Sequence, residues 1–564
     1  MKKRRKEPFS DPKVSPQALK KAKEPKLGQP VVDRTLLLEK FPRGVKFRKY
    51  QQEALLAVAD ALNSGYKYVF LVAPCGLGKT LILATHCAQS KNAYYAVGLK
   101  TLQDQIRKDA LLKPFKIATL KGRSNYRCHY GGNALYGICA FDQSIARQCI
   151  KQKRCQYEIA KQRAIKAQTT CVNIALLLSS EFLTRRELLV LDEAHQLEAT
   201  ILSQLGMVFT AKDNIPLPEK TEWRRYLEWL KDYRKYIQLD LPFLTDDVKD
   251  LEARIMVTRK KEKINQLNKK YRATIKEIER LKGIRRNIDV LLDDYKKNKE
   301  EWVVQSNSET KTVTFEPISV ERFYIPLLFS KGRRTIISSA TPPFPQELGL
   351  DPNEVKILEY PSIFPIPNRP IYYGKAVYSG SMSLKNRAGT IPKIANQIAN
   401  LGKRKTIVHC GSYAIARAIS EELKKFRVKY ILQDQQKRAH SLKQWMETKQ
   451  TPVFLSVNME DGISLDDDLA RINIIAKVPF PYLGDLRVRK RMELPDGRRW
   501  YMSQAIRKVQ QAAGRTTRST EDWSHTFILD SDFERLIQRY DDLFFNWFKD
   551  AMERKRGEET ITPP

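Results

Sequence analysis

The stretch Tyr68-Val-Phe-Leu-Val-Ala-Pro-Cys-Gly-Leu-Gly-Lys-Thr80 decides the fold of this 564-residue chain. An apolar, strand-forming run leads straight into a glycine loop, and a helical pattern follows. Gly76 and Gly78 let backbone N–H groups approach phosphate oxygens. Lys79 is suited to neutralise the β- and γ-phosphates, and the Thr80 hydroxyl is suited to ligate Mg²⁺. The stretch therefore predicts a phosphate loop that binds ATP and Mg²⁺.

A second part of such a site follows another apolar strand. Leu188-Leu-Val-Leu191 runs directly into Asp192-Glu-Ala-His195. A carboxylate that holds Mg²⁺ belongs at the end of a buried strand, where Asp192 stands. Glu193, next to it, is placed to polarise the water that attacks the γ-phosphate. We predict Asp192 as a magnesium ligand and Glu193 as a catalytic carboxylate.

Two arginines near the C-terminus complete the predicted site. The run Gln511-Ala-Ala-Gly-Arg-Thr-Thr-Arg518 spaces Arg515 and Arg518 by three residues, which on a helix puts both on one face. Guanidinium groups there can reach the γ-phosphate across a cleft and stabilise the charge that develops during hydrolysis. A basic helix that faces nucleic acid is the alternative. If the arginines come from a second domain, hydrolysis is coupled to domain closure.

Strands and helices alternate over most of the chain, which predicts an α/β fold with parallel sheets. Residues 211–317 do not follow this alternation of strands and helices. Between residues 247 and 299, apolar residues recur at helical spacing within a highly charged sequence, which predicts two long amphipathic helices packed as a hairpin. Such a hairpin is either a spacer arm or a surface that touches nucleic acid. The further predicted strands lie at 93–99, 335–337, 406–409, 452–455 and 472–475.

The composition is strongly basic, with 101 Lys and Arg against 64 acidic residues and a net charge of +37. Such an excess favours polyanionic partners, because neutralising phosphates releases counterions. A solvated, lysine-rich surface explains it equally well. The sequence contains no apolar run long enough for a membrane span, and the basic N-terminus is not followed by the apolar region of a secretion signal. We expect no membrane association and a flexible N-terminal tail.

Four of the eight cysteines lie close together, at Cys128, Cys139, Cys149 and Cys155. Zinc sites usually contain at least one closer Cys-x2–4-Cys pair, and none exists here. Four thiolates can also hold a [4Fe–4S] cluster. Spacing alone leaves iron–sulfur, zinc and free thiols open. Basic and aromatic residues surround the four, a combination suited to single-stranded nucleic acid.

Several further segments stand in an order shared with one protein family. Lys121–Cys128 is similar to the segment that introduces that family's first cluster cysteine, and Cys155–Leu178 to the one that follows its last. With these segments the chain resembles the XPD/DinG group of superfamily 2, the iron–sulfur DNA helicases, over residues 45–535. The other matching positions are Arg48, Gln51, Asp192–His195, Ser339–Thr341, Gly411–Tyr413, Pro479–Pro481 and Gln511–Arg518.

The resemblance implies two RecA-like domains with ATP bound between them, an inserted iron–sulfur domain and a helical Arch-like domain. It implies that Cys128, Cys139, Cys149 and Cys155 hold a [4Fe–4S] cluster. ATP-site roles are implied for Arg48, Gln51, Gly76, Gly78, Lys79, Thr80 and Gln511, with Lys79, Asp192, Glu193, Arg515 and Arg518 as the catalytic set and Thr80 and Asp192 on Mg²⁺.

One motif departs from the family pattern. Glu460-Asp-Gly-Ile-Ser464 stands where the family has Trp-Glu-Gly-Ile/Val-Asp, so nucleotide coupling or DNA contact at this motif is expected to differ. The predicted division is a basic tail at 1–40, helicase domain 1 at 41–120, 166–210 and 318–345, the cluster domain at 121–165, the Arch-like domain at 211–317, helicase domain 2 at 346–550 and a tail at 551–564.

The resulting prediction is an ATP-dependent 5′–3′ DNA helicase that acts, as a monomer, on single-stranded and forked DNA. RNA–DNA hybrids are a further candidate partner. The alternatives are a remodeller of RNA or R-loops, and a nucleic-acid-binding scaffold with a weak ATPase. We expect a cytoplasmic protein, associated with the nucleoid in a prokaryote or phage and nuclear in a eukaryote.

Overall fold

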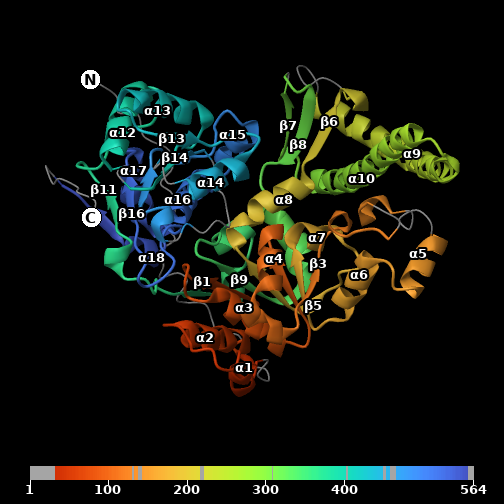
Figure 1. Cartoon of the computed structure of the whole chain (residues 1–564), viewed down its shortest axis with the longest axis horizontal. Helices are drawn as coiled ribbons and strands as arrows, with labels where there is room; N and C mark the ends of the chain where they lie inside the picture. Colours follow the sequence, from red (N-terminus) through yellow and green to blue (C-terminus); the bar gives the residue numbers. More distant parts are fainter. Residues whose placement is uncertain are drawn as a thin grey trace.

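Two seven-stranded parallel sheets organise the molecule, which confirms the predicted α/β class (Figure 1). The computed structural model describes residues 32–556 except 130–131, 138–142, 216–221, 308, 402–403, 449–452, 458–464 and 466. The first sheet has the order β10-β1-β9-β5-β2-β4-β3. Its strands are β1 (Tyr68–Val72), β2 (Ala93–Val97), β3 (Ala118–Leu120), β4 (Thr169–Asn173), β5 (Arg186–Asp192), β9 (Gly332–Ser339) and β10 (Val355–Glu359).

The second sheet has the order β13-β14-β12-β15-β16-β11-β17, again with parallel neighbours. Its central strands are buried along their whole length, as is typical of parallel strands that are covered on both faces. The strands are β11 (Ile371–Tyr373), β12 (Thr406–His409), β13 (Tyr430–Leu432), β14 (Val453–Ser456), β15 (Ile472–Ile475), β16 (His525–Ile528) and β17 (Met552–Arg554).

Each sheet separates two cores, because neighbouring residues of a strand point to opposite faces. In β1, Tyr68 and Phe70 belong to one buried cluster and Val69 and Leu71 to another. Helices cover both faces of the sheets (Figure 1). Around the first sheet these are α2 (Gln51–Asn63), α3 (Lys79–Gln89), α4 (Lys100–Lys108), α7 (Ile174–Ser179) and α8 (Leu197–Leu205); around the second they are α12 (Arg387–Leu401), α13 (Tyr413–Lys425), α14 (Arg438–Glu447), α15 (Leu486–Glu493), α16 (Gly497–Ala513), α17 (Asp532–Tyr540) and α18 (Asn546–Lys549).

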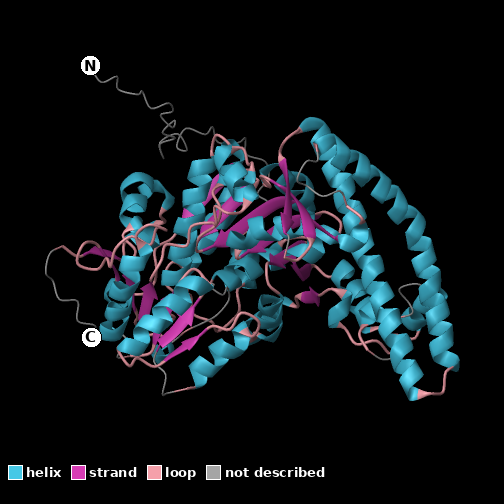
Figure 2. Ribbon diagram, turned by 90° about the horizontal axis from the view of Figure 1, so that it is seen from above, coloured by secondary structure: helices cyan, strands magenta, loops and turns pink. Residues whose placement is uncertain are grey.

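The predicted helical hairpin is present, formed by α9 (Trp223–Val257) and α10 (Lys261–Lys297) (Figure 2). The first helix begins well before the predicted start at residue 247, because its N-terminal half buries an apolar stripe of its own that includes Tyr226 and Leu230. A three-stranded antiparallel sheet that the sequence did not predict supports the hairpin at its base. Its order is β6-β8-β7, with β6 (Met207–Thr210), β7 (Trp302–Asn307) and β8 (Thr312–Pro317).

The cysteine region contains α5 (Gln143–Lys151) and α6 (Gln156–Lys166) and touches the hairpin. Leu135 and Tyr136 pack against a buried cluster on α9 and α10. The hydroxyl of Tyr271 donates to the Tyr136 carbonyl at 3.1 Å. The inserted cysteine region therefore contacts the Arch, the hairpin of α9 and α10, beside the first sheet.

Three predicted boundaries are wrong. The tail at 1–40 contains α1 (Arg34–Lys40), which Asp33 caps and which buries Leu37. Domain 1 continues past 345, because β10 pairs with β1 in the first sheet. The C-terminal tail from 551 contributes β17 to the second sheet, where it pairs with β11. Among the described residues, no helix has the length and apolar character needed to cross a membrane.

Candidate nucleotide site between the two sheets

The glycine loop has the geometry that a phosphate loop needs. Gly76 and Gly78 have φ values of +92° and +88°, which side-chain-bearing residues rarely adopt. Gly78 caps α3, so the N-terminus of this helix faces the loop. The Lys79 ammonium donates to the carbonyl oxygens of Ala73 at 2.9 Å and Pro74 at 3.3 Å. The loop thus holds its cation over the position where phosphates would lie, and the half-buried Thr80 follows at the start of the helix.

Arg48, just before α2, and Gln51, its first residue, both contact the loop. The Arg48 guanidinium donates to the Gly76 carbonyl at 2.6 Å, and the Gln51 amide donates to the Gly78 carbonyl at 3.2 Å. Gln51 Oε1 also accepts from the Arg48 backbone N–H at 3.0 Å. A Cβ added to Gly78 would lie 2.2 Å from Gln51 Nε2, so this packing needs glycine there.

Asp192 ends the central strand β5 and is buried beside the loop. The Tyr95 hydroxyl donates to Asp192 Oδ2 at 2.7 Å, and the Glu193 N–H donates to Oδ1 at 3.0 Å. Burial raises the pKa of Asp192 above its ordinary range, and the charge of Glu193 adds to the effect. A cation at this carboxylate would relieve that cost, which is the environment expected of a magnesium ligand. The sequence did not single out Tyr95.

Glu193 is held in an unusual backbone conformation, with a φ of +54°. Its carboxylate lies 3.3 Å from the Nδ1 of His195. Burial acts to raise the pKa of Glu193, but His195 and the charge of Lys79 together lower it, so the group is ionised at neutral pH. A carboxylate held ionised beside the loop is suited to orient a water molecule.

A line of polar contacts leads from the Asp-Glu-Ala-His segment to the second domain. His195 Nδ1 lies 3.1 Å from the Ser339 hydroxyl, which also accepts from the Thr341 N–H at 3.1 Å. The Gln511 amide of α16 then donates to the Thr341 hydroxyl at 3.1 Å. The Ser339–Thr341 motif therefore links the predicted catalytic carboxylate to Gln511 across the domain boundary.

Arg518 is the residue that reaches the phosphate loop from the second domain. Its guanidinium donates to Cys75 Sγ at 3.0 Å, and its backbone N–H donates to the buried Asp522 at 2.8 Å. The helical placement predicted for the two arginines is wrong, because Gly514 ends α16 and both lie in the loop that follows. Arg515 lies beside the buried His409, whose pKa burial and this arginine both lower.

The segment that connects the two sheets, around Phe364, also covers the loop. No sequence motif predicted this contact. A Cβ at Gly76 would lie 2.4 Å from Cζ of Phe364 and 3.2 Å from Cδ1 of Ile363. Phe364 is buried. The absence of a side chain at Gly76 thus serves both the backbone turn and this packing.

The predicted cluster ligands are described only in part, because Cys139 lies outside the described residues. Cys149 on α5 and Cys155 at the start of α6 are buried, and Cys128 is half-buried. Cys155 Sγ accepts from the Glu158 N–H at 3.5 Å. In the part of the chain that the structure describes, no three cysteine, histidine or acidic side chains gather closely enough to hold a metal ion. The altered Glu460–Ser464 motif also lies outside the described residues.

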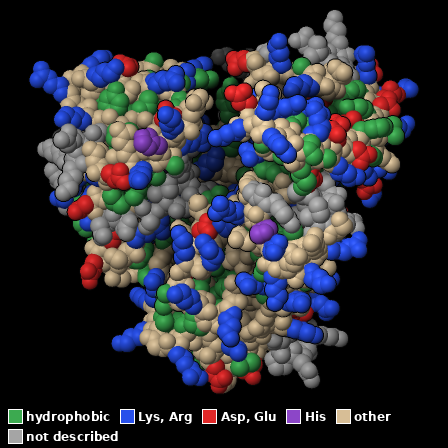
Figure 3. All heavy atoms as spheres, turned by 45° about the vertical axis from the view of Figure 1, so that its right-hand side comes forward, with side chains coloured by type: hydrophobic (Ala, Val, Ile, Leu, Met, Phe, Trp, Pro, Cys, Tyr) green, Lys and Arg blue, Asp and Glu red, His purple; other side chains and the backbone are tan. Residues whose placement is uncertain are grey.

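The surface between the domains is basic. Figure 3 shows Lys and Arg side chains over much of one face, including the walls of a hollow between the upper lobes. This distribution agrees with the net charge of +37. A polyanion would be attracted to this face.

Comparisons with known proteins agree with this architecture. Residues 44–241 match the model of the type III restriction enzyme res subunit, and residues 395–551 match the helicase C-terminal domain. The ATP-dependent DNA helicase YoaA of Haemophilus influenzae is 22% identical over 88% of this chain and 92% of its own length. YoaA of Escherichia coli is 23% identical over 89% and 93%.

Solved structures show the same fold. A structure described as an XPD helicase superposes with a TM-score of 0.57 at 15% identity, covering 91% of this chain and all of that one. Xpd4 of S. tokodaii gives 0.54 at 16% identity, covering 90% of this chain. A phosphate loop on one parallel sheet, faced by an arginine from a second, is the arrangement of a two-domain ATPase. The two matched family models, the YoaA relatives and the XPD fold together support an XPD/DinG-like helicase of superfamily 2.

Proposed function

We propose that this protein is an ATP-dependent DNA helicase that moves 5′ to 3′ along single-stranded DNA and opens forked duplexes. The observation that carries the proposal is the contact of Arg518 with Cys75, which brings a cation of the second domain onto the phosphate loop of the first. The relatives named DNA helicases support the substrate, and the resemblance to the XPD/DinG group supports the polarity.

ATP would be held by residues that the structure already orients around the glycine loop. Lys79 would exchange its contacts with the Ala73 and Pro74 carbonyls for phosphate oxygens. Asp192 and Thr80 would hold Mg²⁺, which neutralises charge on the phosphates when bound. Glu193 would orient the attacking water, and its low pKa keeps it ready to accept a hydrogen bond.

Arg518 would supply the charge that makes hydrolysis depend on domain position. It lies within reach of the loop only while the two domains are close, and a guanidinium at the γ-phosphate stabilises the transition state. Opening after hydrolysis would withdraw it. Alternating closure and opening on a strand bound across both domains produces stepwise movement.

The DNA substrate is tested by unwinding of forks that carry a 5′ tail, a 3′ tail or both, with matched RNA–DNA hybrids. We expect opening that needs ATP and a 5′ single-stranded tail. Opening from 3′ tails alone would contradict the polarity, and activity confined to hybrids would replace DNA by RNA–DNA as the substrate. The same assay at varied protein concentration tests whether a monomer suffices.

We also propose that Cys128, Cys139, Cys149 and Cys155 hold a [4Fe–4S] cluster that organises the segment beside the Arch. The donor chemistry fits, since four thiols occur in a short stretch and two are buried, although the described cysteines alone form no metal-holding group. Iron and sulfide analysis of protein purified without oxygen tests this. Stoichiometric zinc in place of iron would overturn it.

We place the protein's action in the cytoplasm, at the nucleoid in a prokaryote.

A further inference from the structure

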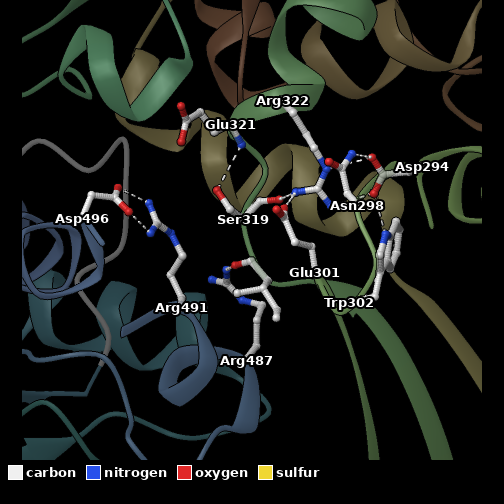
Figure 4. A network of polar contacts seen from close by, with 11 residues as sticks. Asp294, Asn298, Glu301, Trp302, Ser319, Glu321, Arg322, Arg487, Arg491 and Asp496 are labelled. Carbon is white, nitrogen blue, oxygen red and sulfur yellow. Dashed lines mark hydrogen bonds and ion pairs between the residues drawn. The ribbon is translucent and has the colours of Figure 1, made fainter. Parts of the chain in front are cut away.

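The Arch is joined to domain 1 by a short region that we call the Arch neck: α8, the sheet of β6–β8, and Ile318, where the chain returns. Figure 4 looks into the junction between this neck and α15 of the second domain. Arg487 points from α15 toward the segment around Ser319. The second domain therefore meets the Arch at its base as well as meeting domain 1 at the nucleotide cleft.

Arg487 holds both ends of the neck at once. Its guanidinium donates to the Ile318 carbonyl at 3.0 Å, where the chain leaves the Arch. It also lies 3.3 Å from a carboxylate oxygen of Glu198 on α8, which leads into the Arch. The guanidinium carbon lies 5.6 Å from the centre of the Trp500 ring. Arg487 is 9% exposed, so these contacts form away from bulk water.

Glu198 collects further donors from the second domain. Its Oε2 accepts from the Trp500 indole N–H at 2.9 Å and from the Gln504 amide at 2.7 Å, both on α16. Glu198 stands three residues after His195 of the nucleotide site. One carboxylate therefore ties the helix that follows the catalytic segment to two helices of the second domain.

Strand β7 of the neck also forms hydrogen bonds with the second domain. The Gln305 amide of β7 donates to Asp485 Oδ1 at 2.9 Å, and Gln305 Oε1 accepts from the Leu486 N–H at 3.3 Å. These contacts are reciprocal, so they fix the register of α15 against the sheet. The hydrogen bond to the Asp485 carboxylate has one charged partner, and such bonds are stronger than those between neutral groups.

We propose that Arg487 and Glu198 are positioning residues that transmit movement of the second domain to the Arch, so that ATP turnover is converted into strand separation at this joint. The inference rests on the proposed helicase function and adds the contacts that couple ATP turnover to strand separation. Neither residue touches the phosphate loop. Their loss should therefore separate unwinding from hydrolysis instead of reducing both.

The test uses the full-length protein with Arg487→Ala, Arg487→Lys and the control Arg499→Ala, whose ion pair with Asp542 stays within the second domain. We expect R487A to lower the unwinding rate about ten-fold while DNA-stimulated hydrolysis changes less than about two-fold. R487K keeps the cation and should recover most of the loss, and R499A should match wild type. Equal losses of unwinding and hydrolysis in R487A, or no loss of either, would overturn the proposal.

A second readout does not depend on DNA. Hydrogen exchange of wild type with and without AMP-PNP should show protection at the phosphate loop and a changed exchange rate in residues 302–317 of the neck. In R487A the first effect should persist and the second should vanish. Protection at the loop without any wild-type change in the neck would overturn the joint while leaving ATP binding intact. Absent unwinding by wild type would instead count against the proposed function.

Discussion

The second domain meets the first through two regions of opposite character. At the nucleotide cleft, Arg518 donates to the Cys75 thiol and Gln511 donates to the Thr341 hydroxyl, both of which are neutral partners. At the Arch neck the two domains are joined by an ion pair between the buried Arg487 and the half-buried Glu198.

This difference bears on which region opens. The hydrogen bond between Gln511 and Thr341 joins neutral groups and is worth about 1 kcal/mol net. The Arg518 guanidinium has only a weak thiol acceptor, so both contacts can be exchanged for phosphate. Removing one partner of a buried ion pair costs about 3–5 kcal/mol, because the other charge then stays buried without compensation. In the proposed mechanism the cleft is therefore the part that would cycle with ATP, and the joint at the neck is the part that would stay closed and transmit the movement.

The largest expected effect lies in the cleft. Lys79→Ala removes the cation that the loop carbonyls hold in place, and it should lower the rate of ATP hydrolysis by about 10³-fold or more. Lys443→Ala is the matched control, because that lysine is exposed on α14 and pairs with a surface glutamate. A K79A protein that hydrolyses ATP at the wild-type rate would remove the loop from the mechanism.

Arg518→Ala tests the other side of the cleft. Loss of a guanidinium at the γ-phosphate should lower kcat by about 10²–10³-fold, with a much smaller change in the KM for ATP, because the residue acts on the transition state. Arg535→Ala, an exposed arginine paired with Asp532, should leave both constants unchanged. A purely higher KM in R518A would show that this arginine only binds ATP.

A smaller effect is expected from Tyr95→Phe, which deletes the hydroxyl that donates to Asp192. Residues that orient metal ligands typically contribute about ten-fold or more to metal affinity or activity. We expect the Mg²⁺ concentration that gives half-maximal hydrolysis to rise about ten-fold. An unchanged Mg²⁺ dependence would mean that Asp192 needs no such support.

The smallest expected effect is on the free energy of unfolding. It is compared for two buried histidines, His86 beside the first sheet and His409 in the second. His86 donates from Nε2 to the Leu55 carbonyl at 3.1 Å, and burial lowers its pKa to about 4; burial also lowers the pKa of His409, to about 3. The unfolded chain takes up protons below pH 6.5 while the folded imidazoles stay neutral, so stability falls as the pH drops. The loss between pH 7 and pH 5 should be about 2 kcal/mol per histidine.

Urea unfolding of wild type, His86→Asn and His409→Asn at the two pH values measures these contributions. Each single variant should show a smaller loss of stability on acidification than wild type, whatever its stability at pH 7. Parallel pH dependence in all three proteins would show that other groups cause the acid sensitivity.

Much of the nucleotide site could be predicted from the sequence, because its parts are local patterns. The glycine loop and the carboxylates after a buried strand are each encoded within a few residues. The end of α16 at Gly514 could also have been predicted, since glycine commonly ends helices, and with it the position of Arg515 and Arg518 in the loop that follows. Asp33, a good N-cap residue, likewise marked the helix within the predicted tail.

The remaining contacts join residues that are far apart along the chain. Arg518 and Cys75 are separated by 443 residues, and Arg487 and Glu198 by 289. No local sequence pattern around Cys75 or Glu198 identifies the distant arginine that contacts it. Only the packing of the two sheets determines which side chains meet, and for that reason the joint at the neck was not predicted.

In the proposed mechanism the cleft closes on ATP when DNA lies across both domains. The most direct measurement is the ATP hydrolysis rate of wild-type protein without nucleic acid, with single-stranded DNA and with blunt duplex DNA, using K79A to define the background. We predict strong stimulation by single-stranded DNA and little by blunt duplex. A hydrolysis rate that is the same in all three conditions would contradict the claim.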